Sequence, residues 1–210
     1  GEELKTTKPV DIAMVLDNSS SMNYDMVPGK TRWQTLKDSV KNFANQLIGP
    51  SSHNNDNVRI GFSSFGSERQ TIRPGYTSDI PFTKIGKFSP NSSFTSSYDQ
   101  LLKSSIYTPT KAPDNSGTPT FLGVDAGYKM LSDATYGARS DSVKVLIVLT
   151  DGEPTFWNSG YYTSLSNWGS NNDYDNFSTF RDCYSGDGTY SESNHKSTIN
   201  FVNQRANANP

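Results

Sequence analysis

The sequence predicts an α/β fold: a doubly wound, mostly parallel sheet with helices on both faces, in a single domain spanning residues 1–210. Two observations predict this class. Apolar runs with the length of buried strands occupy residues 10–16 (VDIAMVL) and 143–149 (VKVLIVL). Other segments carry apolar residues at intervals of three and four, as amphipathic helices do. Strands that alternate with helices along a chain are typical of a sheet covered on both faces.

The predicted strands differ in the strength of their signal. The runs at residues 10–16 and 143–149 are strongly apolar, and each is followed within two positions by an acidic residue, Asp17 or Asp151. Residues 58–65 form a weaker strand, in which Val58, Ile60 and Phe62 alternate. A helix of similar length could imitate that last pattern.

The first predicted helix covers residues 32–48. Thr31 and Gln34 have the spacing of a capping box, and Gly49-Pro50 then ends the helix. The residues expected on its buried face are Trp33, Leu36, Val40, Phe43, Ala44 and Leu47.

Two further helices are predicted, at residues 119–132 and 195–206. Thr118 is the expected N-cap of the first, with Pro119 at the tolerated first position. The apolar residues of the two helices are Phe121, Leu122, Val124, Tyr128 and Leu131, then Ile199, Phe201 and Val202.

Two stretches show neither the alternation of a strand nor the three- and four-residue spacing of a helix. Residues 73–94 contain three prolines, and residues 156–194 are rich in Tyr, Ser, Asn, Gly and Trp. Unstructured loops of this length are uncommon in compact domains, so both are interpreted as insertions, or arms, with a role of their own.

The composition excludes several classes of partner and site. A net charge of −2 provides no basic field for nucleic acid, and no apolar run approaches the roughly 20 residues needed for membrane insertion. The first residues lack the apolar centre of a signal peptide, as expected of a mature protein or an excised fragment. One cysteine, Cys183, excludes a disulfide framework within the chain. Ser, Thr and Asn together make up 68 of the 210 residues, a polar but weakly charged composition that favours an extracellular surface protein.

The first strand leads directly into an Asp-x-Ser-x-Ser pattern, Asp17-Asn-Ser19-Ser-Ser21. The spacing alone is weak, because such residues routinely form turns capped by their own side chains. The position is more informative, since open α/β sheets bind ligands outside the carboxyl ends of their strands. Asp151 follows another strand at the equivalent end.

Side-chain oxygens of these residues suit a hard divalent cation. Two carboxylates and three hydroxyls form an all-oxygen set of the kind that Mg²⁺ prefers, with Mn²⁺ or Ca²⁺ as alternatives. Thr118 could instead serve only as an N-cap. The predicted metal ligands are Asp17, Ser19, Ser21, Thr118 and Asp151.

This combination resembles the metal-ion-dependent adhesion site of von Willebrand factor type A domains. The match comprises the Asp-x-Ser-x-Ser pattern, the Thr118 of Gly-Thr-Pro-Thr and the Asp151 of Leu-Thr-Asp-Gly-Glu, in family order. The resemblance implies that the serines bind the ion directly, that the threonine and the aspartates bind it directly or through water, and that an acidic ligand group completes the shell.

The two arms and the neutral surface look more like the tip adhesins of Gram-positive sortase-assembled pili than like integrin domains. The resemblance implies arms around the metal site and a location on the cell wall or at a pilus tip. In that family further strands follow the helix placed at residues 195–206, whereas this sequence ends at Pro210. About two strands are therefore expected to be absent through truncation or cleavage, or to be supplied by another chain.

The second arm concentrates aromatic residues among small polar ones, a mixture typical of binding loops. A self-packed arm whose rings form a private core is the equal alternative. The candidate ligand-binding residues are Trp157, Tyr161, Tyr162, Trp168 and Tyr174.

These features favour an adhesion module over an enzyme. The expected partner is an acidic group of a host matrix or cell-surface protein, with a glycan as the alternative. No nucleophile elbow or phosphate-binding loop accompanies the acidic motifs. A metal-dependent hydrolase and a purely structural pilus or cell-wall component are the competing hypotheses.

Overall fold

A four-stranded sheet with the order β5-β4-β1-β6 forms the centre of the molecule. It is seen in a computed structural model that describes residues 8–50, 57–158 and 184–185. Strands β1 (Val10–Asp17), β4 (Val58–Arg73) and β6 (Val143–Leu149) are parallel, and β5 (Tyr76–Ile85) runs antiparallel to β4. The predicted mostly parallel α/β sheet is therefore confirmed.

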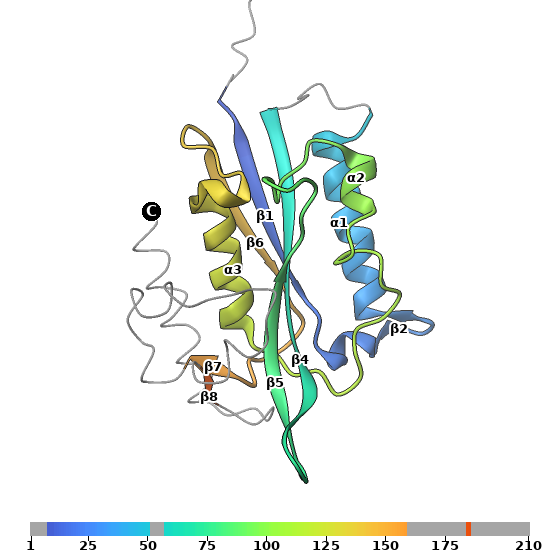
Figure 1. The fold of residues 1–210 in the computed structure, drawn as a ribbon. Helices are drawn as coiled ribbons and strands as arrows, with labels where there is room; N and C mark the ends of the chain where they lie inside the picture. The colour runs from blue at the N-terminus through green and yellow to red at the C-terminus, as the bar shows by residue number, and fades with distance from the viewer. Residues whose placement is uncertain (1–7, 51–56, 159–183, 186–210) are drawn as a thin grey trace, which may run out of the picture.

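Helices cover both faces of this sheet (Figure 1). Helices α1 (Arg32–Ile48) and α2 (Tyr98–Leu102) lie on one side, and α3 (Thr120–Ser132) lies on the other. None of the described helices is long and apolar enough to cross a membrane. The shorter elements are the 3₁₀ turns η1 (Ser20–Asn23) and η3 (Ala134–Tyr136) and the strand pairs β2 (Asp25–Val27) with β3 (Lys30–Thr31) and β7 (Trp157–Asn158) with β8 (Tyr184–Ser185).

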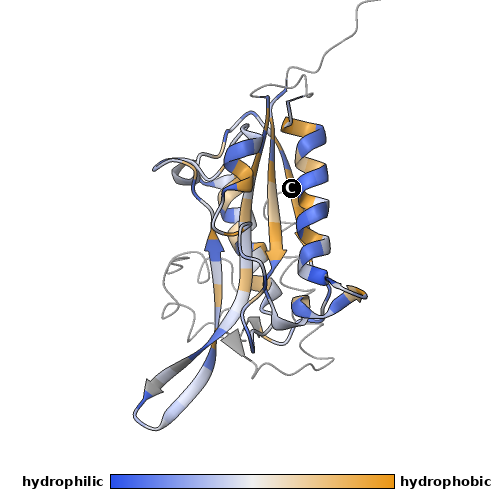
Figure 2. Cartoon of the chain, turned by 90° about the vertical axis from the view of Figure 1, so that its right-hand side faces the viewer, coloured by the Kyte–Doolittle hydropathy of each residue, from blue (hydrophilic) through white to orange (hydrophobic). Residues whose placement is uncertain are grey.

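Strand β1 supplies side chains to two separate cores, because successive residues of a strand point to opposite faces. Ile12, Met14 and Leu16 pack beneath α1, whereas Ala13 belongs to the core beneath α3. Figure 2 shows the resulting apolar colouring of the central strands. Burial on both faces fixes the position of the residues that follow β1 at its carboxyl end.

Helix α1 begins and ends where the sequence predicts. The Thr31 hydroxyl accepts a hydrogen bond from the Gln34 backbone at 3.1 Å, and the Gln34 side chain accepts one from the Thr31 backbone at 2.9 Å. This reciprocal capping box satisfies two amides that the first turn leaves without helical partners. Gly49 follows the last residue, Ile48.

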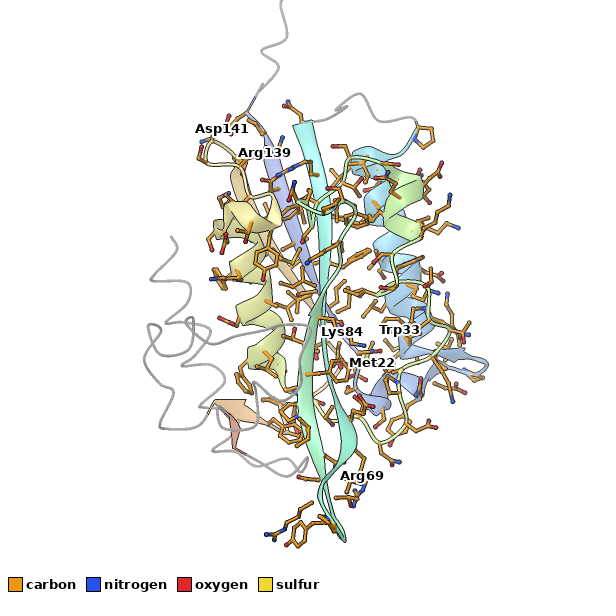
Figure 3. The ribbon with its side chains drawn as sticks, in the orientation of Figure 1. Met22, Trp33, Arg69, Lys84, Arg139 and Asp141 are labelled. Carbon is orange, nitrogen blue, oxygen red and sulfur yellow. The ribbon has the colours of Figure 1, made fainter. Side chains whose placement is uncertain are left out.

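The edge of the sheet at β5 differs from the prediction. Strand β4 continues eight residues beyond the predicted end, and β5 lies within residues 73–94, where no regular structure was predicted. The two strands meet at Pro74-Gly75, with Gly75 in the left-handed region at a φ of 74°. The resulting hairpin extends past the carboxyl edge of the sheet in Figure 1, and Figure 3 places Arg69 close to its end.

The start of α3 is shifted by one residue from the prediction. Pro119, not Thr118, is its N-cap, and it makes no side-chain capping bond. The predicted capping role of Thr118 is therefore wrong. The helix buries Phe121, Leu122, Val124 and Leu131 as predicted, whereas Tyr128 is only half-buried. The predicted helix at residues 195–206 lies outside the described residues.

Two glycines allow α3 to approach the sheet closely. A Cβ atom at Gly123 would meet the Phe65 ring and would lie 2.7 Å from Val15 Cγ1. A Cβ atom at Gly127 would lie 3.0 Å from Val15 Cγ2. Side chains at these positions would force the helix away from β1.

We expect Gly123→Ala to lower the free energy of unfolding by about 1–3 kcal/mol, the usual cost of overpacking a core. This loss is opposite in sign to the usual effect of Gly→Ala at an exposed helical position, which is a gain of up to about 1 kcal/mol. Urea unfolding measures the change. The exposed Gln46→Ala in α1 is the control and should stay within about 0.5 kcal/mol of the parent protein. Equal stability of Gly123→Ala and the parent would contradict the close-packing argument.

Candidate metal site

The loop after β1 folds back on its own first residue. Asp17 is the last residue of β1, and its Oδ1 accepts a hydrogen bond from the Ser19 backbone amide at 2.8 Å. The side-chain hydroxyls of Ser19 and Ser21 lie 3.1 Å apart. Asp17 is fully buried and Ser19 almost so. The Asp-x-Ser-x-Ser spacing thus places three oxygen-bearing side chains on one side of a tight turn.

The loop after β6 reaches the same place because β6 is hydrogen-bonded to β1 along its length. The Thr150 hydroxyl donates a hydrogen bond to Asp17 Oδ2 at 2.7 Å, and the Ser21 hydroxyl donates one to Asp151 Oδ1 at 3.2 Å. Four of the five predicted site residues therefore form one hydrogen-bonded cluster at the carboxyl edge of the sheet. We call Asp17, Ser19, Ser21 and Asp151 the acidic cluster.

Thr118 lies in the loop before α3. This loop is hydrogen-bonded both to the loop after β1 and to the loop after β6. The Ser116 carbonyl accepts hydrogen bonds from the Ser20 backbone and hydroxyl at 2.9 and 3.0 Å. The Thr118 backbone amide donates to the Thr155 hydroxyl at 2.8 Å, and the Thr118 carbonyl accepts from the Thr155 amide at 3.1 Å. Within the described part of the chain, no hydrogen bond joins the Thr118 side chain to the acidic cluster. Because Thr118 is not a helix cap, its hydroxyl is not committed to α3.

The ionised form of Asp17 is unfavourable within the acidic cluster. Burial raises the pKa of the Asp17 carboxyl to about 6, and the nearby charge of Asp151 adds to this rise. Hydrogen bonds from Ser19 and Thr150 oppose the rise without cancelling it. A cation beside Asp17 would stabilise its ionised form.

The donor atoms fit a hard cation. The cluster offers two carboxylates and two hydroxyls, with the Thr118 hydroxyl on the adjoining loop, and contains no nitrogen or sulfur ligand. In the ranges that the structure describes, no group of three or more His, Cys, Asp and Glu residues gathers as a metal cluster. A cation held here would therefore depend on hydroxyl oxygens, which suits Mg²⁺, Mn²⁺ or Ca²⁺ better than softer metals.

Sequence reasoning missed Arg32, the first residue of α1. Its guanidinium Nη1 lies 2.7 Å from Asp151 Oδ2 and forms a salt bridge with it. The two residues are 119 positions apart, so no local pattern joins them. One signal was available: a cation at the start of a helix is unfavourable beside the helix dipole and needs a reason to be there. Thr150, which holds Asp17, was also missed.

The predicted aromatic contact residues fall mostly outside the described part of the chain. Tyr161, Tyr162, Trp168 and Tyr174 lie there, so their role stays a prediction. Trp157 begins β7, whose backbone pairs with β8. The ring of the preceding residue, Phe156, is fully buried in the core beneath α3.

Comparisons with known proteins give one matching family and several solved structures with a similar fold. The model of the von Willebrand factor type A domain matches residues 11–167. Two structures of the pilus adhesin SpaC from Lactobacillus rhamnosus GG, one in an open conformation, superpose with TM-scores of 0.63 and 0.58 at 23% and 22% identity. Each alignment covers 100% of this chain and 24% of the SpaC chain.

The pilus adhesin RrgA from Streptococcus pneumoniae superposes with a TM-score of 0.53 at 16% identity, over 91% of this chain and 30% of that chain. At these identities the likeness concerns the fold. The present chain thus spans about a quarter to a third of the length of these adhesins. A search of curated proteins gave no match.

Proposed function

The chain belongs to the von Willebrand factor type A domain family, and from that premise we propose that it is an extracellular adhesion module that binds its partner through a divalent cation. The partner group would be a carboxylate of a host matrix or cell-surface protein. The observation that carries the proposal is the meeting of Asp17, Ser19 and Ser21 with Asp151, from two different strand ends, in one partly buried cluster.

Each residue of the site has a distinct task in this proposal. Asp17 and Asp151 would supply the two negative charges that balance a divalent cation, and Ser19, Ser21 and Thr118 would supply neutral oxygens. When bound, the cation would act as an electrophile with a coordination position for an acidic group of the partner. Thr150 holds the Asp17 carboxylate in place from the outside.

The fold supports an adhesive rather than a catalytic use of this cluster. In the described residues, the groups hydrogen-bonded to the two carboxylates are the Ser19 backbone amide and the side chains of Ser21, Thr150 and Arg32, none of which is a general base. The fold is also that of solved pilus adhesins. The cell surface, including a pilus tip, is the location that this function requires.

Thermal unfolding with and without Mg²⁺ tests the cation step. At about 100 times its Kd, an ion that binds only the folded state adds about 2.7 kcal/mol of stability. For a domain of this size that corresponds to a rise in Tm of roughly 5–10 °C. A sodium salt at equal ionic strength is the control for screening. An unchanged Tm at all Mg²⁺ concentrations would refute the proposal.

Attachment tests the partner step. The protein should adhere to immobilised matrix proteins or host cells in Mg²⁺ and detach in a chelator. Turnover of generic phosphoesters in Mg²⁺, without such attachment, would favour a hydrolase instead. Attachment that is equal in Mg²⁺ and in chelator would favour a cation-independent or purely structural role.

A further inference from the structure

Arg32 places an internal cation against the acidic cluster. The Asp151 carboxylate is shared: Oδ1 accepts a hydrogen bond from Ser21 at 3.2 Å, and Oδ2 lies 2.7 Å from the Arg32 guanidinium. One oxygen of this carboxylate therefore faces the candidate cation ligands, while the other faces a permanent positive charge. The side chains are 10% exposed for Asp151 and 34% exposed for Arg32, so water screens their attraction only in part.

The helix itself does not explain an arginine at this position. A positive side chain at the first residue of a helix is repelled by the positive end of the helix dipole. Tyr24 nevertheless contacts this arginine twice, because the Arg32 backbone amide donates to the Tyr24 carbonyl at 2.8 Å and the guanidinium lies 5.7 Å from the centre of the Tyr24 ring. Its charge offsets that of Asp151.

Charge at the site decides which ligands it favours. The two carboxylates of the acidic cluster carry two negative charges, and Arg32 reduces the sum to one. A divalent cation would then leave the site with one positive charge instead of none. An anion is attracted to such a site, whereas the cation itself is held less tightly than by two uncompensated carboxylates.

Arg32 is also accessible to a partner. It lines a cavity of about 180 Å³ together with Met22, Leu36, Thr150 and Asp151. A guanidinium is a preferred donor to carboxylates.

We propose that Arg32 is a positioning and specificity-determining residue of the site, which weakens the hold on the divalent cation and strengthens the hold on an acidic partner group. This inference rests on the proposed function. It adds that the ligand preference is set by a residue outside the metal-ligand set, 119 positions from the carboxylate that it contacts.

Isothermal titration with Mg²⁺ at fixed ionic strength tests the first half of the proposal. Arg32→Gln should bind Mg²⁺ about tenfold more tightly than the parent protein, because a full charge near the ion is removed. Arg32→Lys keeps the charge and should stay within about threefold of the parent. The matched control is Lys30→Gln, two residues away, where the lysine is paired with the exposed Asp38. It should leave the Mg²⁺ affinity unchanged.

Titration of the Mg²⁺-loaded proteins with sodium acetate, against sodium chloride at equal ionic strength, tests the second half. Backbone amide chemical shifts report binding, and Arg32→Gln should bind acetate several-fold more weakly than the parent. Equal or weaker Mg²⁺ binding by Arg32→Gln, or equal acetate affinity in both proteins, would overturn the inference.

The outcomes separate this inference from the proposed function. If the parent binds Mg²⁺ and Arg32→Gln binds it no better, only the role of Arg32 is refuted. If neither protein binds Mg²⁺, the proposed function fails as well. Should Arg32→Gln lose helical circular dichroism in chelator, Arg32→Met keeps the apolar stem of the side chain and repeats the titrations with the same expected results.

Discussion

Asp17→Asn is expected to abolish divalent-cation binding and, at the same time, to make the cation-free protein more stable at pH 7. The Asp17 carboxylate is fully buried and accepts hydrogen bonds from the Ser19 amide and the Thr150 hydroxyl. Its pKa is raised to about 6, chiefly by burial, so its charge is costly at neutral pH. An asparagine amide keeps the shape and removes the charge.

The sign follows from the direction of the pKa shift. Between about pH 4 and pH 6 the folded protein binds more protons at Asp17 than the unfolded chain does. Stability from this residue is therefore present at low pH and is lost as the pH rises through the folded pKa. The advantage of Asp17→Asn should grow over the same range, to at most about 3 kcal/mol at pH 7.

Urea unfolding in chelator at pH 4.5 and pH 7, combined with Mg²⁺ titration, measures both effects. The matched variant is Asp151→Asn. It should also lose Mg²⁺ binding but should gain no stability, because it leaves the Arg32 guanidinium without its carboxylate partner. An Asp17→Asn protein that still binds Mg²⁺, or that is less stable than the parent in chelator at pH 7, would contradict this account.

Asp11→Ala is expected to cause the largest loss of stability, about 3–5 kcal/mol, because it leaves two partly buried arginines without their shared counter-charge. Asp11 is fully buried near the amino end of β1 and forms salt bridges with Arg59 at 2.8 Å and Arg139 at 2.6 Å. Ser142 donates a further hydrogen bond to it at 2.8 Å. In Figure 3, Arg139 lies near one end of the sheet, and the hairpin residue Arg69 lies beyond the other end.

The pH dependence of Asp11 runs opposite to that of Asp17. Burial by itself would raise the pKa of Asp11, but hydrogen bonds from Arg59, Arg139 and Ser142 outweigh it and lower the pKa to about 2. Its contribution to stability is therefore present above about pH 4 and is lost as the pH falls towards 2. The difference in unfolding free energy between the parent and Asp11→Asn should shrink over that interval.

Denaturant unfolding at several pH values checks these expectations. Asp38→Ala, which breaks an exposed ion pair with Lys30, is the control and should change stability little. If Asp11→Ala proves too unstable to purify, Asp11→Asn carries the pH test alone. A pH-independent difference between Asp11→Asn and the parent would show that the carboxylate charge is not what stabilises this edge.

The elements that were predicted correctly carry their signal within a few residues. The apolar runs of β1 and β6 and the Thr31–Gln34 capping box of α1 are local patterns, and each appears where the sequence places it. The outer half of β4 was missed because residues 66–73 are mostly polar. Beyond Ser67 the strand lies in a hairpin that extends past the helices, where Glu68, Arg69, Thr71 and Arg73 are exposed, so burial does not impose an apolar pattern there.

Strand β5 was missed because residues 73–94, which contain three prolines, show no sustained period. Pro81 lies within β5, opposite Ser67 of β4. Proline is tolerated in a strand at the edge of a sheet, and β5 is such a strand among those described. The Pro74-Gly75 dipeptide was the available signal for the turn.

The candidate site was predictable as far as it follows from strand ends. Parallel neighbours β1 and β6 end side by side, which brings Asp17 and Asp151 together. Contacts that depend on tertiary packing were not predictable. The Arg32–Asp151 salt bridge joins the start of α1 to the loop after β6, and the Thr118–Thr155 hydrogen bonds join that loop to the one before α3. The role of Thr118 as a helix cap was wrong because Pro119 takes that position.

The central place of β1 has a mechanical consequence. Asp17 is the last residue of this strand. The strand begins at the opposite end of the sheet (Figure 1). Eight residues of β1 pair with β4 and seven pair with β6. A tensile force applied between a ligand held at Asp17 and the amino end of β1 would be carried by the covalent backbone of this one strand. The hydrogen bonds from β1 to β4 and β6 would bear little of that load. The site could therefore transmit tension to the amino end of β1 without rupture of these interstrand bonds.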